Sequence, residues 1–371
     1  MNQRDVYTNI SKIIERDSKS TTYKFALLRG VIDIIQDNSP FIAVRDDRVF
    51  IPMGLLVEKW ILYYYPIFES EEFIPQIHGS SNIAFSSQLT TIIDTYRMKG
   101  GFSGFYNDLK NRGIPEDLQQ QFLALAKKVA DTIKRMPMKY IGRSISNDYY
   151  SIFRCHPIRP RNKRSEIGIR ELINDFGEFS IPFEYYEAFK VLGSFINGRD
   201  SIFVKWAEFS VNASGNRLSV ERVMNEVLKS PVTERAIRES KRLYENILAS
   251  EGSVQCVWTG EQIPGFDVDH LIPFSVWRNN DLWNLLPARA SINNKKRDKI
   301  PGAKLIDARK ELILYYWDLV NQKEPIRFQK ELQFSLLGNH SFDNWHNTAI
   351  EQLKSSCNYL INTRGFEEWT I

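Results

Sequence analysis

Five side chains in the last third of the sequence include residue types that metal-assisted hydrolysis uses. Asp269 and His270 are adjacent, and Asn284, Asn293 and Lys296 follow His270 at 14, 23 and 26 residues. An imidazole titrates near neutral pH, so His270 could take a proton from water. Carboxylate and amide oxygens bind hard cations, and an oxygen-only set favours Mg²⁺ or Mn²⁺ over Zn²⁺. The combination fits hydrolysis of a phosphodiester, which needs an activated water and a counter-charge for the phosphorane.

The elements expected to position these side chains are two strands, a loop and a helix. Thr259-Gly260 and Pro264-Gly265 are typical of turns, so the first part is predicted to be a hairpin. The stretch from Ala288 to Arg297 suits a helix that packs back across the strands. Because neighbouring strand residues point to opposite faces, Asp269 and His270 can serve one phosphate only where the chain is locally irregular.

Residues 254–301 resemble the ββα-metal nuclease module of the HNH endonuclease family. The resemblance rests on the five residues above together with Pro273 and the closing Pro301. Their spacing is similar to that of the HNH domain in RNA-guided CRISPR effector nucleases, and Asn293 stands where the family name has its second histidine. The resemblance implies that His270 is the general base and that Asp269 and Asn293 hold one Mg²⁺, for which Mn²⁺ substitutes. It further implies that Asn284 braces the loop between strand and helix and that Lys296 belongs to the catalytic set.

Two groups of basic residues are candidates for binding nucleic acid. Lys295 and Arg297 flank Lys296 and could reach neighbouring phosphates. The segment 154–164 contains five Lys or Arg residues, no acid and two prolines. Such a segment can follow a phosphate backbone, and it can equally be an exposed loop paired with acids elsewhere. The residues expected to contact nucleic acid in this second group are Arg159, Arg161, Lys163 and Arg164.

The composition excludes several classes of protein. Hydrophobic residues make up 43% and charged residues 25% of the 371 positions, which is typical of a globular chain. A net charge of +4 is too small to indicate a nucleic-acid partner by itself. Three cysteines without a CxxC pair argue against a disulfide scaffold and a four-cysteine zinc site. Because no apolar run approaches the roughly 20 residues of a membrane span, we expect a soluble, cytoplasmic protein.

The fold class expected from the sequence is α+β, as a mostly helical multidomain protein with the HNH module in its C-terminal half. Apolar periodicity predicts most of the helices, residues 41–44 and 48–51 predict a hairpin, and residues 148–154 and 201–209 are rich in strand-forming residues. The expected parts are a helical region with a hairpin over 1–137, a mixed recognition or linker region over 138–250, the HNH module over 251–302 and a helical extension over 303–371.

These observations favour a metal-dependent DNA endonuclease, and by analogy a restriction enzyme or another anti-phage effector. Duplex DNA is the expected substrate, with a homodimer and a regulatory or defence-system protein as possible partners, and no membrane. A compact module buries little surface, so the residues before it must read sequence, sense a modified base or dock a partner. Two alternatives stay open, namely an HNH nuclease that acts on RNA or as a regulated toxin, and a non-catalytic nucleic-acid-binding protein.

Overall fold

The computed structural model describes residues 3–15, 20–78, 82–141, 151–158, 167–197 and 202–371, and these residues are mostly helical. The chain divides into two compact units. Unit 1 consists of residues 1–36 and 41–231, and unit 2 consists of residues 37–40 and 232–371. The expected class, mostly helical α+β with an HNH module in the C-terminal half, is confirmed. The division into four parts is finer than these two units and stays a prediction.

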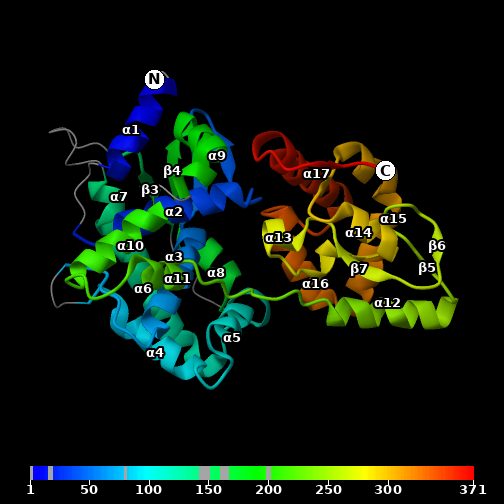
Figure 1. Cartoon of the computed structure of the whole chain (residues 1–371), viewed down its shortest axis with the longest axis horizontal. Helices are drawn as coiled ribbons and strands as arrows, with labels where there is room; N and C mark the ends of the chain where they lie inside the picture. The colour runs from blue at the N-terminus through cyan, green and yellow to red at the C-terminus, as the bar shows by residue number, and fades with distance from the viewer. Residues whose placement is uncertain (1–2, 16–19, 79–81, 142–150, 159–166, 198–201) are drawn as a thin grey trace. The chain divides into compact units, whose positions relative to one another are not determined.

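Unit 1 consists of helices around one four-stranded antiparallel sheet (Figure 1). The strand order is β1-β2-β4-β3, with strands β1 (Ala43–Arg45), β2 (Arg48–Pro52), β3 (Arg154–His156) and β4 (Glu178–Pro182). The helices are α1 (Gln3–Glu15), α2 (Tyr23–Gln36), α3 (Met53–Glu69), α4 (Ser86–Tyr96), α5 (Gly101–Asn107), α6 (Gln119–Arg135), α7 (Pro137–Tyr140), α8 (Ile169–Asp175), α9 (Phe183–Asn197), α10 (Ile202–Ala213) and α11 (Val220–Val227).

Helix α3 forms the centre of unit 1. It begins directly after Pro52 and buries residues around its whole circumference, as a helix enclosed by other helices must. Gly54 permits this packing, because a Cβ there would lie 2.0 Å from the backbone oxygen of Leu172 in α8. Glu58 is buried in the same helix and forms an ion pair with Lys110 at 2.5 Å. The predicted hairpin over residues 41–51 is confirmed as β1 and β2.

The prediction of a strand over residues 201–209 is wrong for its described part, because residues 202–209 belong to helix α10. The buried residues of α10 recur at helical spacing, and they include Ile202, Trp206 and Ser210. Strand propensity measures how well a side chain fits a half-buried pleated surface, and tertiary packing overrides it. The strand that does pair with the hairpin is β4, which the sequence pattern did not indicate.

Unit 2 contains the segment that resembles the HNH module, together with the helices before and after it (Figure 1). Strands β7 (Asp267–His270) and β8 (Leu285–Ala288) form an antiparallel pair, and β5 (Val254–Gln255) and β6 (Gln262–Ile263) form the predicted hairpin around Thr259-Gly260. Strands β9 (Ile300–Pro301) and β10 (Glu368–Trp369) pair in parallel. The helices are α12 (Arg238–Glu251), α13 (Phe274–Trp277), α14 (Ala290–Lys296), α15 (Ala303–Lys323), α16 (Pro325–Leu332) and α17 (Trp345–Asn358).

The helices after Pro301 pack on the nuclease segment and share its core. Trp258 and Trp283 from the segment and Trp317 from α15 are fully buried in one cluster. The Trp317 Nε1 donates to the carbonyl of Trp283 at 2.7 Å, and the Tyr316 hydroxyl donates to the carbonyl of Gln255 at 2.7 Å. Helix α15 therefore contributes both apolar surface and hydrogen bonds to the module.

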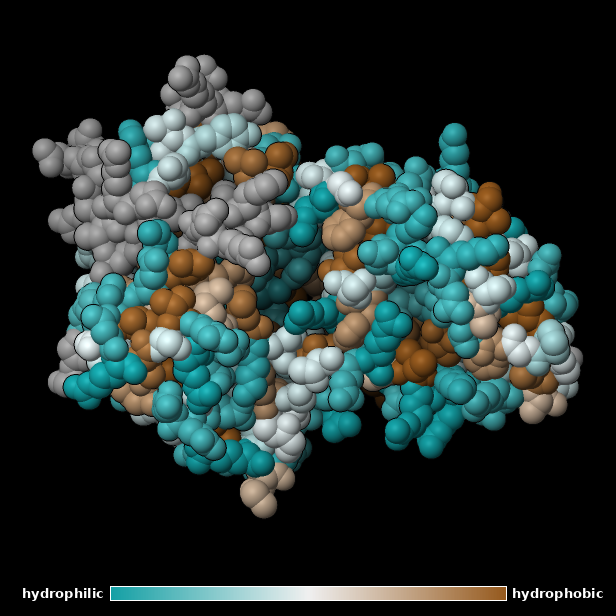
Figure 2. Space-filling model, viewed as in Figure 1, coloured by the Kyte–Doolittle hydropathy of each residue, from teal (hydrophilic) through white to brown (hydrophobic). Residues whose placement is uncertain are grey.

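The face of the molecule shown in Figure 2 is mainly polar. Hydrophilic residues cover most of the face shown in Figure 2, and apolar residues on it lie in separate patches. Within the described ranges, no helix is long and apolar enough to cross a membrane.

Candidate active site

Strand β7 positions the two residues at the centre of the candidate site. Asp269 pairs with Leu286 and His270 with Leu285 of β8, and both side chains are buried, at 6% and 4% exposure. The local irregularity expected at these two residues is absent, because both pair in register with β8, and their side chains meet different neighbours as alternation along a strand requires. The carboxylate of Asp269 contacts Trp258 and Lys296, whereas the ring of His270 contacts other residues, described below.

The carboxylate of Asp269 has two strong donors. The Trp258 Nε1 donates to Oδ2 at 2.6 Å, and the Lys296 Nζ donates to Oδ1 at 3.2 Å. Burial raises the pKa of Asp269, while Lys296 and Trp258 act in the opposite direction. Burial likewise lowers the pKa of Lys296, and the charge of Asp269 opposes that change. Each charge of the buried Asp269–Lys296 pair is therefore stabilised by the opposite charge of its partner.

Lys296 lies in the interior and not at the surface where a phosphate would meet it. Its side chain is 0% exposed, and its Nζ also donates to the backbone carbonyl of His270 at 2.5 Å. This one ammonium group ties helix α14 to the end of β7. The neighbouring Lys295 and Arg297 are exposed. The resemblance assigns Lys296 to the catalytic set, and the structure directs its amino group to Asp269.

The environment of His270 keeps its imidazole neutral. Burial is the largest cause and lowers the pKa of His270 to about 4, and the charges of Arg235 and Lys296 act in the same direction. The Nε2 lies 3.2 Å from the Oδ1 of Asn280, and the ring packs on Phe274 at 5.6 Å between centroids. A neutral imidazole at neutral pH has one nitrogen available to accept a proton.

Asn284 joins the two ends of the loop between β7 and β8. Its Oδ1 accepts from the backbone nitrogen of Ile272 at 2.8 Å, and its Nδ2 donates to the carbonyl of Ile272 at 3.0 Å. Its own carbonyl accepts from the backbone nitrogen of Leu271 at 2.7 Å. The amide is completely buried, so each of its bonds replaces a bond to water that burial removes.

Asn293 and Asp269 could hold a cation between α14 and β7. Asn293 is half-buried and lies three residues before Lys296, so it shares the helix face that Lys296 directs toward Asp269. The Asn293 side chain makes no hydrogen bond with any residue that the structure describes. In the same residues no group of three or more His, Cys, Asp and Glu side chains could hold a metal. A cation here would use one carboxylate and one amide oxygen, with its other positions free for water and phosphate, and this donor set fits Mg²⁺.

Two residues that are not among the five identified from the sequence also act on residues of the site. Asn280 contacts His270, and its side chain accepts from the backbone nitrogen of Ala236 at 3.1 Å and donates to the carbonyl of Glu234 at 2.9 Å. Arg235 lies between those two residues, is exposed, and its charge acts on both His270 and Lys296. The only sequence signal for Asn280 was a polar Asn-Asn-Asp run, which is also typical of an ordinary turn.

The basic group predicted in the segment 154–164 falls almost entirely outside the described residues. Arg159, Arg161, Lys163 and Arg164 all lie in the range 159–166. Arg154, at the start of β3, is described and exposed on an outer strand of the sheet. Contact of the four residues with nucleic acid stays a prediction.

Comparison with known protein families agrees with the site's residues. Residues 256–302 match the family described as HNH endonuclease, so the chain contains an HNH endonuclease domain there. Residues 3–227 match a second family, described as a domain of unknown function, DUF8808. Neither a curated protein nor a solved structure matches the chain. An HNH domain implies a nuclease that acts on nucleic acid.

Proposed function

We propose that this chain, which belongs to the DUF8808 family and carries an HNH endonuclease domain, is a metal-dependent endonuclease that cleaves duplex DNA. The observation that carries the proposal is the buried, neutral His270 beside the buried Asp269 at the end of β7, within the matched domain. A histidine whose pKa lies below neutrality is unprotonated at physiological pH and can accept a proton.

In the proposed mechanism, His270 accepts the proton of the attacking water. Asp269 and Asn293 would hold Mg²⁺, for which Mn²⁺ substitutes, and the bound ion would stabilise negative charge on the phosphate. Trp258 and Lys296 fix the Asp269 carboxylate through its two oxygens. Lys296 thereby acts on the site through Asp269, and Asn284 keeps the loop ends in register.

We propose that three further cations of the site contact the nucleic-acid backbone. Arg235, Lys295 and Arg297 are exposed, and among the described residues none of them forms an ion pair. By contrast, Arg289 on the same domain is paired with Glu261 at 2.6 Å. An unpaired surface cation can exchange its counterions for phosphates, which is the main source of affinity for DNA.

The proposal has two more specific parts. The substrate is duplex DNA, and the protein acts in restriction or anti-phage defence. A compact nuclease domain offers little surface for recognition, and unit 1 is a separate body with its own core and sheet. We propose that unit 1 reads a sequence or a modified base, or docks a regulatory or defence-system protein.

Cleavage of supercoiled plasmid by the wild type and by His270→Ala tests the proposed activity. We expect Mg²⁺-dependent nicking or linearisation by the wild type and loss of it in EDTA. His270→Ala should lose about 10²- to 10⁴-fold in rate while keeping its affinity for DNA, because a general base acts only in the transition state. Equal activity of the two proteins would contradict the assignment. Competition with single-stranded DNA and RNA identifies the substrate, and preference for RNA would overturn the DNA proposal.

The defence role has its own test. Bacteria that express the wild-type chain should resist infection by some phages, and bacteria that express His270→Ala should not. Plasmid cleavage without protection against any phage of a broad panel would leave the nuclease proposal intact and contradict the defence role.

A further inference from the structure

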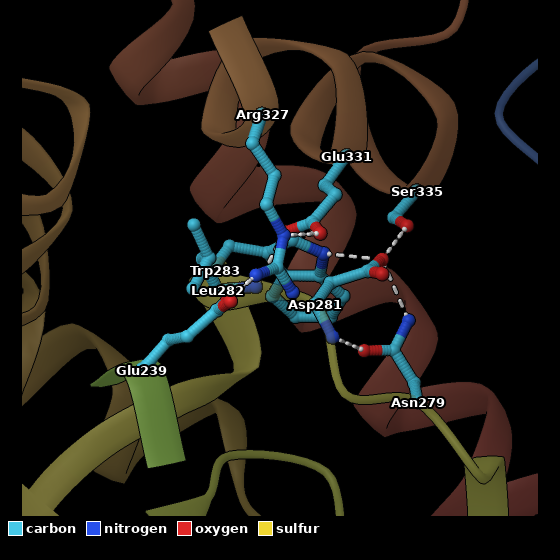
Figure 3. Close-up of polar contacts among 8 residues, drawn as sticks. All are labelled: Glu239, Asn279, Asp281, Leu282, Trp283, Arg327, Glu331 and Ser335. Carbon is cyan, nitrogen blue, oxygen red and sulfur yellow. Dashed lines mark hydrogen bonds and ion pairs between the residues drawn. The ribbon is translucent and has the colours of Figure 1, made fainter. Parts of the chain in front are cut away.

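The loop that follows β7 is held by helix α16, which lies beyond the matched domain. The Asp281 carboxylate accepts three hydrogen bonds, from Asn279 Nδ2 at 2.7 Å, Trp283 Nε1 at 3.1 Å and Ser335 Oγ at 2.7 Å. Figure 3 shows these donors converging on one carboxylate. Ser335 lies in the π-helical turn Gln333–Leu337 that continues from α16, so this contact links the loop to the C-terminal helices.

A second carboxylate from α16 holds the next residue of the loop. Glu331 is buried and accepts from the backbone nitrogen of Leu282 at 2.6 Å (Figure 3). Its other oxygen accepts from the Arg327 Nε at 2.6 Å, and Arg327 is also paired with Glu239 of α12. The loop is therefore fixed on the C-terminal side of residue 280 by both Asp281 and Leu282.

Asn280 lies between these fixed points, and its amide has one possible orientation. The backbone nitrogen of Ala236 can only donate, so the atom of Asn280 that faces it must be the oxygen. The carbonyl of Glu234 can only accept, so the atom that faces it must be the nitrogen. The two backbone groups assign the amide independently, and they agree.

This orientation determines the tautomer of His270. The Asn280 Oδ1 lies 3.2 Å from the His270 Nε2, and an amide oxygen can only accept. The hydrogen of the neutral ring must therefore be on Nε2, which leaves the lone pair on Nδ1. Without this contact, the ring would populate both tautomers. Only the Nε2–H tautomer presents Nδ1 as the base to the attacking water.

We propose that Asn280 is a positioning residue that fixes His270 in the Nε2–H tautomer, with Nδ1 as the base, and that Asp281 and Glu331 hold Asn280 in place. In this proposal the C-terminal helical extension helps to position the catalytic histidine, although it lies outside the matched residues 256–302. The inference rests on the proposed function only for the role of His270 as the base.

The tautomer is measured directly by ¹H–¹⁵N spectra of histidine-labelled protein, in which ring nitrogens with and without hydrogen have different shifts. The chain has five histidines, and the signal missing in His270→Ala identifies the ring in question. We expect Nε2–H alone in the wild type and in Asn280→Asp, which keeps an acceptor. Asn280→Ala should show a mixture. An Nδ1–H ring in the wild type, or an unchanged ring in Asn280→Ala, would overturn the proposal whether or not the protein cleaves DNA.

Kinetics test the support from α16. Glu331→Ala should lower kcat by about 10- to 100-fold, as loss of an outer-shell contact does, with KM within about twofold. Glu331→Gln should recover part of kcat, because one oxygen can still accept from Leu282. Ser335→Ala removes a single donor and keeps the fold testable if Glu331→Ala does not fold. The exposed Glu311→Ala on α15 is the control and should match the wild type. Unchanged kcat in folded Glu331→Ala and Ser335→Ala would overturn the support role.

Discussion

At the scale of single residues, the candidate site depends on a buried charge pair. Asp269 would be costly to bury as an anion by itself, and Lys296 compensates it from within the same pocket. The arrangement keeps both charges of the pair away from solvent, with side-chain exposures of 0% for Lys296 and 7% for Asp269. Such a pair is sensitive to the loss of one partner, because the other charge remains buried.

Lys296→Met should therefore destabilise unit 2 by roughly 3–5 kcal/mol, as removal of one partner from a buried pair does. Chemical denaturation followed by tryptophan fluorescence measures the effect, since Trp258 lies against Lys296. Lys295→Met is the matched control, because Lys295 is exposed, and its free energy of unfolding should stay within about 0.5 kcal/mol of the wild type. Equal stability of the two variants would show that the buried pair contributes little.

At the scale of the elements, α16 places a titrating carboxyl group inside unit 2. Burial is the largest cause and raises the pKa of Glu331 to about 8, the charge of Asp281 raises it further, and Arg327 lowers it. In the unfolded chain the same group titrates near its ordinary value of 4.5. Between these two values the folded state binds the proton that the unfolded state has lost. The stability that Glu331 contributes is thus complete below about pH 4.5 and is lost as the pH rises through about 8.

Glu331→Gln should flatten this part of the pH dependence, because glutamine does not titrate. The difference in unfolding free energy between variant and wild type should change by at most about 5 kcal/mol from pH 4.5 to 8, in favour of the variant at the higher pH. Urea denaturation across this pH range measures the difference. The exposed Glu311→Gln serves as the control. A constant difference between Glu331→Gln and the wild type would contradict the raised pKa.

At the scale of the whole molecule, two sets of cations can be separated by their effect on DNA binding. Replacing Arg159, Arg161, Lys163 and Arg164 with alanine should lower the slope of log affinity against log salt by about one for each lost phosphate contact. Replacing Arg235, Lys295 and Arg297 should do the same for unit 2. Binding to duplex DNA in EDTA, at several salt concentrations, measures both slopes. An unchanged slope would assign the set concerned to ordinary solvated surface.

Double-strand cleavage should require two chains. One chain has one His270 and one Asp269–Asn293 pair, so it cuts one strand at a time, and the opposite strand runs antiparallel. A two-fold dimer would place a second site on that strand at once, because its symmetry matches that of the duplex. Light scattering of DNA-bound protein beside a plasmid time course tests this. A monomer on DNA that linearises plasmid without accumulating nicked circles would contradict the dimer.

The sequence by itself determined the HNH domain and most helices. Side-chain type and spacing identify the domain, because the proposed chemistry requires the residue types of Asp269, His270 and Asn293 at fixed positions along the chain. Apolar periodicity identified helices such as α6 and α15, since one face of each is buried along its length. Residue type, spacing and apolar periodicity are local properties, so they can be read directly from the amino-acid sequence.

Only the tertiary structure decided the long-range contacts. Residues 202–209 form a helix despite strand-forming residues, because packing within unit 1 decided their conformation. Lys296 points inward to Asp269, 27 residues away, and not outward to solvent. Asn280 contacts His270 and Glu331 contacts the loop after β7, although their local sequence resembles that of an ordinary turn and an ordinary helix. Their importance comes from the distant groups that they contact, and those contacts exist only once the chain has folded.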